Sequence, residues 1–158
     1  MAELAPPDPP VAPIFILADD DREAIELIQK MLNVEWYYVP IWETRLVIRY
    51  AKHFATTAVF LADPIDYPDG GAARLLQDLL DRVGKPVVVM SEVWSPEIAG
   101  RWKRMGACDC IPHPTRFHER IEGLRAKMQD FSLRQVGGEG VGHSSLARYT
   151  TPPTYFGA

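Results

Sequence analysis

The sequence has few cysteines and no long apolar run. Only two cysteines occur in its 158 residues, Cys108 and Cys110. A separation of one residue does not suit a structural disulfide, and two such ligands alone do not make a zinc site. No apolar stretch approaches the roughly 18 residues of a membrane span, and residues 1–13 have neither the basic nor the apolar region of a signal peptide. These absences predict a protein of a reducing, cytoplasmic compartment, with no membrane partner.

Motifs for binding nucleotides and nucleic acids are also missing. The sequence contains neither a Gly-x-Gly-x-x-Gly run nor a Gly-Lys-Ser/Thr phosphate loop, and its "VGKP" turn leads into an apolar strand instead of opening a helix. The formal net charge of −4 argues against a nucleic-acid backbone as the main partner. His53, His118 and His143 show no metal-ligand spacing.

Composition divides the chain into three parts. Residues 1–13 are rich in proline and are expected to form an extended arm, whereas residues 14–131 carry the apolar patterns of one domain. Residues 132–158 are rich in Gly, Ser, Thr and Pro and are expected to form a flexible tail. Tyr155 and Phe156 in this tail are candidate contacts for a partner or for the protein's own surface, and an idle tail is the alternative.

Five apolar strand patterns alternate with five amphipathic helical patterns along residues 14–131. The expected strands cover residues 14–18, 35–39, 58–62, 87–90 and 108–111. The second of these is expected to stop at Pro40, and the helix after it to begin at Trp42. Continuous apolar strands that alternate with helices predict an α/β fold, a doubly wound parallel sheet of five strands covered on both faces.

Polar residues stand directly after these strands. Right-handed crossovers bring the carboxyl ends of parallel strands to one edge, where ligands bind. The residues at that edge are Asp19, Asp20, Asp63, Ser91 and His113. Carboxylate oxygens suit Mg²⁺, so a divalent cation is expected to offset the repulsion among the aspartates. Asp21 is expected to cap the following helix and not to bind the cation.

The motifs at these strand ends resemble those of one family. They are "ILADDD" after the first strand, "AVFLAD" followed by Pro68 and Gly71, "PVVVMS" at the fourth strand and "GACDCIPHP" near the fifth. In this order, they make residues 14–131 similar to the receiver domain of bacterial two-component response regulators, the CheY-like, flavodoxin-like fold.

The resemblance implies a role for each residue at the sheet edge. Asp63 would be the phosphoacceptor, and Asp19 and Asp20 would hold Mg²⁺ together with Asp63 and the backbone carbonyl of Ile65. Ser91 would donate a hydrogen bond to the phosphoryl group. A histidine kinase or a phosphotransfer protein would be the phosphoryl donor.

Two positions depart from the family pattern. His113 stands before Pro114 where the family has lysine, and histidine is shorter and only partly charged at neutral pH. Cys110 stands at the switch position, where the family usually has an aromatic residue that swings inward on phosphorylation. Either the switch works differently here, or the chain is a receiver that no longer switches.

A partner surface is expected around the fourth helical pattern. Trp94, Trp102, Arg101 and Arg104 are candidates, because the helix after the fourth strand, the fifth strand and the last helix form the usual dimer or partner face in the family. Core packing is the alternative for Trp102, which shares a helical stripe with Ile98, and a solvated face is the alternative for the arginines.

Three functions compete at this stage. The first is a stand-alone receiver, not an enzyme, that is phosphorylated on Asp63 and acts through protein contacts, including a possible homodimer. The second is a phosphorylation-independent adaptor or scaffold. The third, more distant, is a phosphatase with an aspartate nucleophile, suggested by the Asp-x-Asp spacing of Asp19 and Asp21, although Glu23 stands where that family has Thr or Val.

Overall fold

A computed structural model describes residues 13–32, 37–115 and 121–137. The sheet has five parallel strands in the order β2-β1-β3-β4-β5. The strands are β1 (Phe15–Ala18), β2 (Tyr38–Ile41), β3 (Ala58–Asp63), β4 (Val87–Ser91) and β5 (Asp109–Pro112). The helices are α1 (Arg22–Leu32), α2 (Val47–His53), α3 (Gly71–Arg82), α4 (Pro96–Arg104) and α5 (Ile121–Gly137), with a short 3-10 helix, η1, at Thr44–Leu46. The predicted fold class is confirmed.

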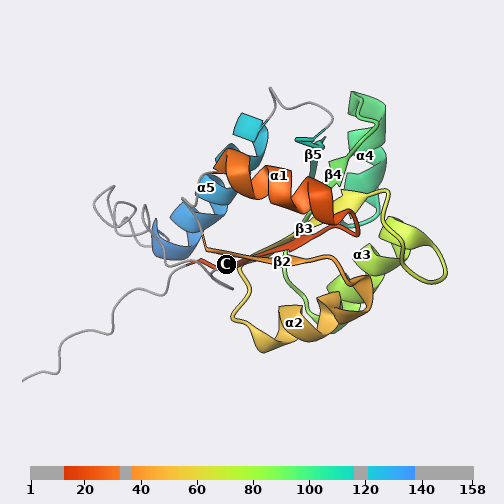
Figure 1. The fold of residues 1–158 in the computed structure, drawn as a ribbon, viewed down its shortest axis with the longest axis horizontal. Coiled ribbons are helices and arrows are strands. Elements are labelled where there is room, and N and C mark those ends of the chain that lie inside the picture. Colours follow the sequence, from red (N-terminus) through yellow and green to blue (C-terminus); the bar gives the residue numbers. More distant parts are fainter. Residues whose placement is uncertain (1–12, 33–36, 116–120, 138–158) are drawn as a thin grey trace, which may run out of the picture.

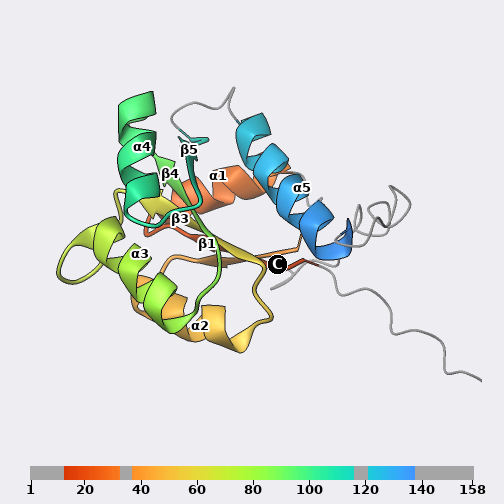
Figure 2. The ribbon, with the colours of Figure 1, turned by 180° about the vertical axis from the view of Figure 1, so that it is seen from behind.

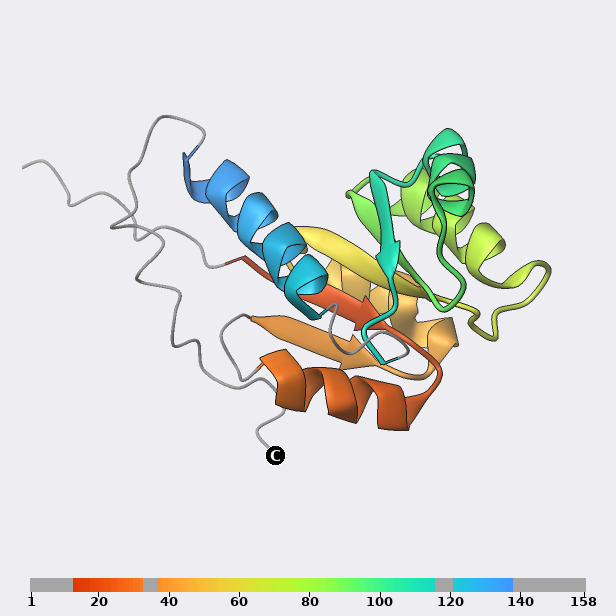
Figure 3. The ribbon, with the colours of Figure 1, turned by 90° about the horizontal axis from the view of Figure 1, so that it is seen from above.

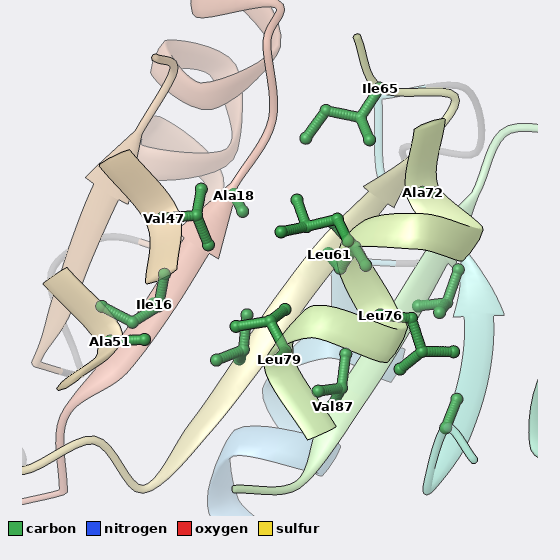
Figure 4. Close-up of a cluster of buried hydrophobic side chains, with 14 of the residues drawn as sticks. Ile16, Ala18, Val47, Ala51, Leu61, Ile65, Ala72, Leu76, Leu79 and Val87 are labelled. Atoms are coloured by element: carbon green, nitrogen blue, oxygen red, sulfur yellow. The ribbon is translucent and has the colours of Figure 1, made fainter. Parts of the chain in front are cut away.

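Helices cover both faces of the sheet and produce two hydrophobic cores. Helices α1 and α5 lie side by side on one face, and α2 and α3 lie on the other (Figures 1 and 3). Phe15 and Phe60 meet edge to face under α1 and α5, with ring centroids 5.7 Å apart. On the opposite face, Leu61 of the sheet contacts the buried leucines of α3 (Figure 4). The central strands are buried on both faces, as their continuous apolar sequences predict.

The second strand differs from its prediction. It runs from Tyr38 to Ile41 and contains Pro40, which lies opposite Leu17 of β1, whereas we expected Pro40 to end the strand. Strand β2 is the edge of the sheet, and proline is tolerated there because the missing N–H faces away from the neighbouring strand. The helix expected from Trp42 also begins later, with η1 at Thr44.

The last helix continues beyond residue 131. Phe131 and Ser132 are both buried, and the Ser132 hydroxyl donates to the carbonyl of Met128, 2.8 Å away. Helix α5 therefore enters the segment expected as a tail. The N-terminal arm, except for Pro13, and the tail after Gly137 lie outside the described residues, and so do Tyr155 and Phe156. In the part of the chain that the structure describes, no helix has the length and apolar character needed to cross a membrane.

Candidate functional site

The register of the parallel sheet brings the predicted polar residues to one edge. Asp63 is the last residue of β3 and lies opposite Ser91, the last residue of β4. Asp19 follows β1 directly, and its N–H donates to the carbonyl of Ile41 at 3.1 Å. The His113 N–H donates to the carbonyl of Ser91 at 2.9 Å. The strand ends therefore position all four residues by backbone pairing.

Asp19 lies in a buried hydrogen-bond network. Its side chain is nearly inaccessible, and its residue is 3% exposed. One carboxylate oxygen, Oδ1, accepts the N–H of Asp21 at 3.0 Å, and Oδ2 lies 2.9 Å from Nε2 of His113. Asp21 uses its own Oδ1 to accept the N–H groups of Glu23 and Ala24, at 3.1 and 3.3 Å. The predicted cap of α1 is therefore present, and the cap contacts occupy Asp21.

The hydrogen bonds of His113 define the tautomer of its ring. The ring is buried, and its Nδ1 accepts the backbone N–H of Thr115 at 3.2 Å. A nitrogen that accepts from an N–H carries no proton, so the proton must be on Nε2, from which it is donated to Asp19. His113 thus supplies a hydrogen bond to the Asp19 carboxylate without the fixed charge of a lysine.

Asp20 faces outward and contacts the loop that follows β3. Its Oδ2 accepts the backbone N–H of Asp66 at 2.9 Å, and the residue is exposed. This bond joins the end of β1 to the segment that carries Ile65. The Ile65 side chain is buried, and a Cβ added at Gly71 would lie 3.2 Å from the Ile65 carbonyl oxygen. Glycine at position 71 therefore leaves space beside that carbonyl.

Asp63 is half-buried and has a weaker set of contacts. Its Oδ2 lies 3.5 Å from the Ser91 hydroxyl, while the same hydroxyl donates to the carbonyl of Val93 at 2.7 Å. A hydroxyl has one proton, and the shorter contact takes it. Burial raises the pKa of Asp63, the Ser91 hydroxyl opposes this in part, and the negative charge of Glu92 raises it further.

A small cavity opens beside these residues. Its volume is about 190 Å³, and four of its seven lining residues are acidic. The lining residues are Asp19, Asp20, Asp21, Ala24, Pro64, Glu92 and His113. Sequence reasoning missed Glu92 and Thr115. Glu92 had a usable signal, since it directly follows the fourth strand, whereas the contact of Thr115 depends on the turn after β5.

The acids fit a magnesium ion in chemistry and charge. Their oxygens are hard ligands, and among the described residues no lysine or arginine forms an ion pair with Asp19, Asp20 or Asp63. Within the described ranges, however, no three acidic, histidine or cysteine side chains lie close enough together to hold a metal. The donors are suitable, and their side chains would have to turn toward one another to bind the ion.

The phosphatase alternative would rely on Asp19 and Asp21. Asp19 would carry out the attack, but it is buried and both of its oxygens accept hydrogen bonds. Asp21 would be the second acid of that motif, and it caps α1. Asp19 is thus withdrawn from solvent, whereas Asp21 is exposed and uses Oδ1 for the cap.

Cys110, which the family resemblance places at the switch position, bonds to the loop that follows β4. Cys110 is buried in β5, and its carbonyl accepts the indole N–H of Trp94 at 2.9 Å. Burial, with the charges of Asp109 and Asp63, raises the pKa of the Cys110 thiol to about 12. The thiol is therefore protonated and inert at neutral pH. The Trp94 bond joins β5 to the loop that directly follows Ser91.

The expected partner surface is only partly available. Trp94 is 38% exposed, and Arg101 and Arg104 are exposed on α4. Trp102 is 9% exposed and packs in the core against the sheet, which corrects its assignment to a partner surface. Val93 and Met105 add exposed apolar area to this region. Tyr155 and Phe156 lie outside the described residues.

Comparison with solved structures identifies similar folds. A receiver domain of the Francisella response regulator 1452 aligns with a TM-score of 0.64 at 18% identity, covering 77% of this chain and 98% of that one. The signal receiver domain of a putative Luxo repressor from Vibrio parahaemolyticus aligns with a TM-score of 0.63 at 16% identity, covering 83% and 100%.

A third similar structure was solved in an activated form. The BeF3-activated receiver domain of RstA from Klebsiella pneumoniae aligns with a TM-score of 0.59 at 21% identity, covering 73% of this chain and 98% of that one. No protein-family model matches the sequence, and neither does any curated protein. At these identities the similarity establishes the fold.

Proposed function

We propose that this chain, which has the receiver fold of response regulators, is a regulatory module of a two-component pathway and not an enzyme. Asp63 is its phosphoacceptor in this proposal. The supporting observation is the alignment of Asp63 with Ser91 at the carboxyl edge of the central strands, with the carboxylate 3.5 Å from the hydroxyl. Asp63 is also half-exposed, so a phosphoryl donor has access to it.

The proposed reaction transfers a phosphoryl group to a carboxylate oxygen of Asp63. The new oxygen–phosphorus bond forms as the donor's bond to phosphorus breaks, and the product is a mixed anhydride. The Ser91 hydroxyl would turn from the Val93 carbonyl to a phosphoryl oxygen. That contact exists only in the phosphorylated state, so it favours one of two conformations.

Mg²⁺ is the cofactor that we propose for this reaction. Asp19, Asp20, Asp63 and the carbonyl of Ile65 would hold it, and when bound it would neutralise charge on the transferred group. His113 contributes a hydrogen bond to Asp19 and no fixed charge. The metal would therefore have to neutralise more of the negative charge of the site than in a receiver with lysine.

We propose that output passes through protein contacts near β4, β5 and α4. Trp94 connects this surface to the site, because its indole bonds to the carbonyl of Cys110 while its loop begins at Ser91. Arg101 and Arg104 offer charge to the partner. The proposed partners are a histidine kinase or phosphotransfer protein, a second copy of the chain and a downstream protein, in the cytoplasm.

The test is phosphorylation by a small donor. The full chain is incubated with acetyl phosphate and Mg²⁺, and intact mass spectrometry measures addition of one phosphoryl group. We expect an adduct on the wild type and on the control Asp81→Asn, which alters an exposed acid of α3, but none on Asp63→Asn. An adduct on Asp63→Asn would move the site elsewhere, and no adduct on any variant would refute phosphorylation.

A phosphorylation-independent adaptor is the second candidate. It is favoured by the hydrogen bonds already made inside the site: His113 engages Asp19, and the Ser91 proton points to Val93. If the chain is an adaptor of this kind, the wild type and Asp63→Asn should bind the partner with the same affinity. If partner binding changes with beryllofluoride in the wild type alone, the adaptor hypothesis is wrong.

A further inference from the structure

A groove between α2 and α3 is lined by basic side chains. Its volume is about 530 Å³, and it shares no lining residue with the acidic cavity. Figure 2 shows α2 and α3 side by side on the face of the sheet opposite α1 and α5. The cationic lining residues are Arg45, Arg49, Lys52, Arg74 and Arg82.

Most of this positive charge is not neutralised locally. Arg45 pairs with Glu43 at 3.2 Å, and Arg74 pairs with Asp78 at 3.3 Å. The remaining three cations, Arg49, Lys52 and Arg82, form no ion pair with any residue that the structure describes.

The like charges also stand close together along α2. Arg45 of η1 lines the groove together with Arg49 and Lys52 of α2. Arg49 and Lys52 are three residues apart on one helix, a spacing at which side chains are neighbours. Neighbouring side chains of like charge repel one another. An anion in the groove would remove this repulsion.

The acidic residues of the groove are too few to balance it. Five cations face two acids, Asp69 and Asp78, although the whole chain carries a net charge of −4. Asp78 is fully engaged, since Oδ1 contacts Arg74 and Oδ2 accepts the Tyr67 hydroxyl at 2.6 Å. Asp78 thus fixes the positions of Arg74 and Tyr67 and leaves the cations of α2 without a counter-charge.

We propose that this groove binds a compact anion that carries two or more phosphate groups. Guanidinium groups bond phosphate oxygens in pairs, and several cations around one concave site match a polyphosphate better than a single carboxylate. The volume lies within the range of about 300–1,000 Å³ typical of small-molecule pockets, which favours a small ligand over an acidic protein segment. Side chains provide the contacts here, consistent with a sequence that has no phosphate loop.

This binding goes beyond phosphorylation at Asp63 and does not depend on it. The groove is lined by η1, α2, α3 and the loop between β3 and α3, and none of its lining residues lines the acidic cavity. The ligand would therefore be a second input to the same domain. Asp63→Asn should bind it as the wild type does, so failure of one proposal leaves the other standing.

The experiment is calorimetric titration of the full chain with two probes in EDTA, which removes divalent cations from the acidic cavity. The probes are inorganic tripolyphosphate and adenosine triphosphate. We expect saturable binding of at least one. Equal affinities assign the recognition to phosphates alone, and tighter binding of the nucleotide adds a contact to its nucleoside; both outcomes support the site.

Matched variants separate this groove from general charge effects. Arg49→Gln/Lys52→Gln and, separately, Arg82→Gln should weaken binding about tenfold or more, the effect of one lost charged contact. Lys30→Gln/Lys85→Gln removes two exposed charges outside the groove and should bind like the wild type. Thermal melting without probe checks that each variant is folded.

Three results would overturn the proposal. They are the absence of saturable binding by either probe up to the millimolar range, an equal loss of affinity in the control, and unchanged affinity in both groove variants. Binding of an acidic peptide such as oligoglutamate, with no binding of either phosphate probe, would also reject it and would assign the groove to a protein partner.

Discussion

Two halves of the acidic edge differ in how their carboxylates are held. Asp19 is buried and accepts hydrogen bonds at both oxygens, one of them from His113. Asp63 is half-buried and has a hydroxyl at 3.5 Å whose proton is directed to Val93. The first half is built as a fixed structural element, and the second keeps an acid accessible. A receiver reaction needs the second kind of carboxylate as its nucleophile.

The largest expected effect is the loss of His113. His113→Ala should lower the free energy of unfolding by about 3 kcal/mol, because it leaves a buried carboxylate without a donor and opens a cavity. Urea denaturation measures this. His53→Ala, which removes an exposed histidine from α2, should change stability by less than about 0.5 kcal/mol. If both variants lose the same free energy of unfolding, Asp19 and His113 are not a fixed structural element.

Replacing Asp63, the accessible acid, should raise the stability of the fold, whereas replacing His113 lowers it. Burial raises the pKa of Asp63 above its ordinary value of 3.8, so between that value and the raised one the folded state binds more protons than the unfolded state. Stability therefore falls as pH rises through this window. Asp63→Asn should melt about 1–3 °C higher than the wild type at neutral pH.

The pH dependence of that difference is the sharper measurement. It should shrink as pH falls through this window and vanish below 3.8, where Asp63 becomes protonated in both states. Thermal melts of Asp63→Asn and Asp81→Asn across this range provide the comparison. A lower melting temperature for Asp63→Asn at neutral pH would show that the carboxylate stabilises the fold, contrary to our description.

The smallest expected effect concerns the two thiols. Cys108 is exposed, whereas Cys110 is buried with its pKa raised to about 12 by burial and by Asp109 and Asp63. A thiol reagent should label one cysteine in the native protein at neutral pH and both after unfolding. In a Cys108→Ser background, Asp63→Asn should make Cys110 react slightly faster. An unchanged rate would mean that Asp63 does not act on β5.

Much of the edge could be predicted from the sequence. Alternation of apolar strands with helices implies a parallel sheet, and a parallel sheet places Asp63 and Ser91 at the same edge. Ser95 caps α4 through the N–H of Ile98 at 3.1 Å, as a serine before proline predicts. These features depend on local pattern and on the direction of the strands.

Other features depend on contacts between distant segments. The orientation of the His113 ring depends on its contact with Thr115, and Pro40 is tolerated because β2 is an edge strand. The basic groove needs Arg49 of α2 and Arg82 of α3 to line the same hollow, which no spacing along the chain reveals. Trp102 was ambiguous because a helical stripe does not distinguish a core from an interface.

Both outer strands of the sheet contain a proline. Pro40 lies in β2 and Pro112 in β5, and Asp109 of β5 is also tied to Lys103 and Lys127. A proline offers no amide hydrogen to an incoming strand, so neither margin is a good template for adding another chain. Self-association by strand addition is thereby discouraged at both margins, and copies of this molecule should meet through their helices.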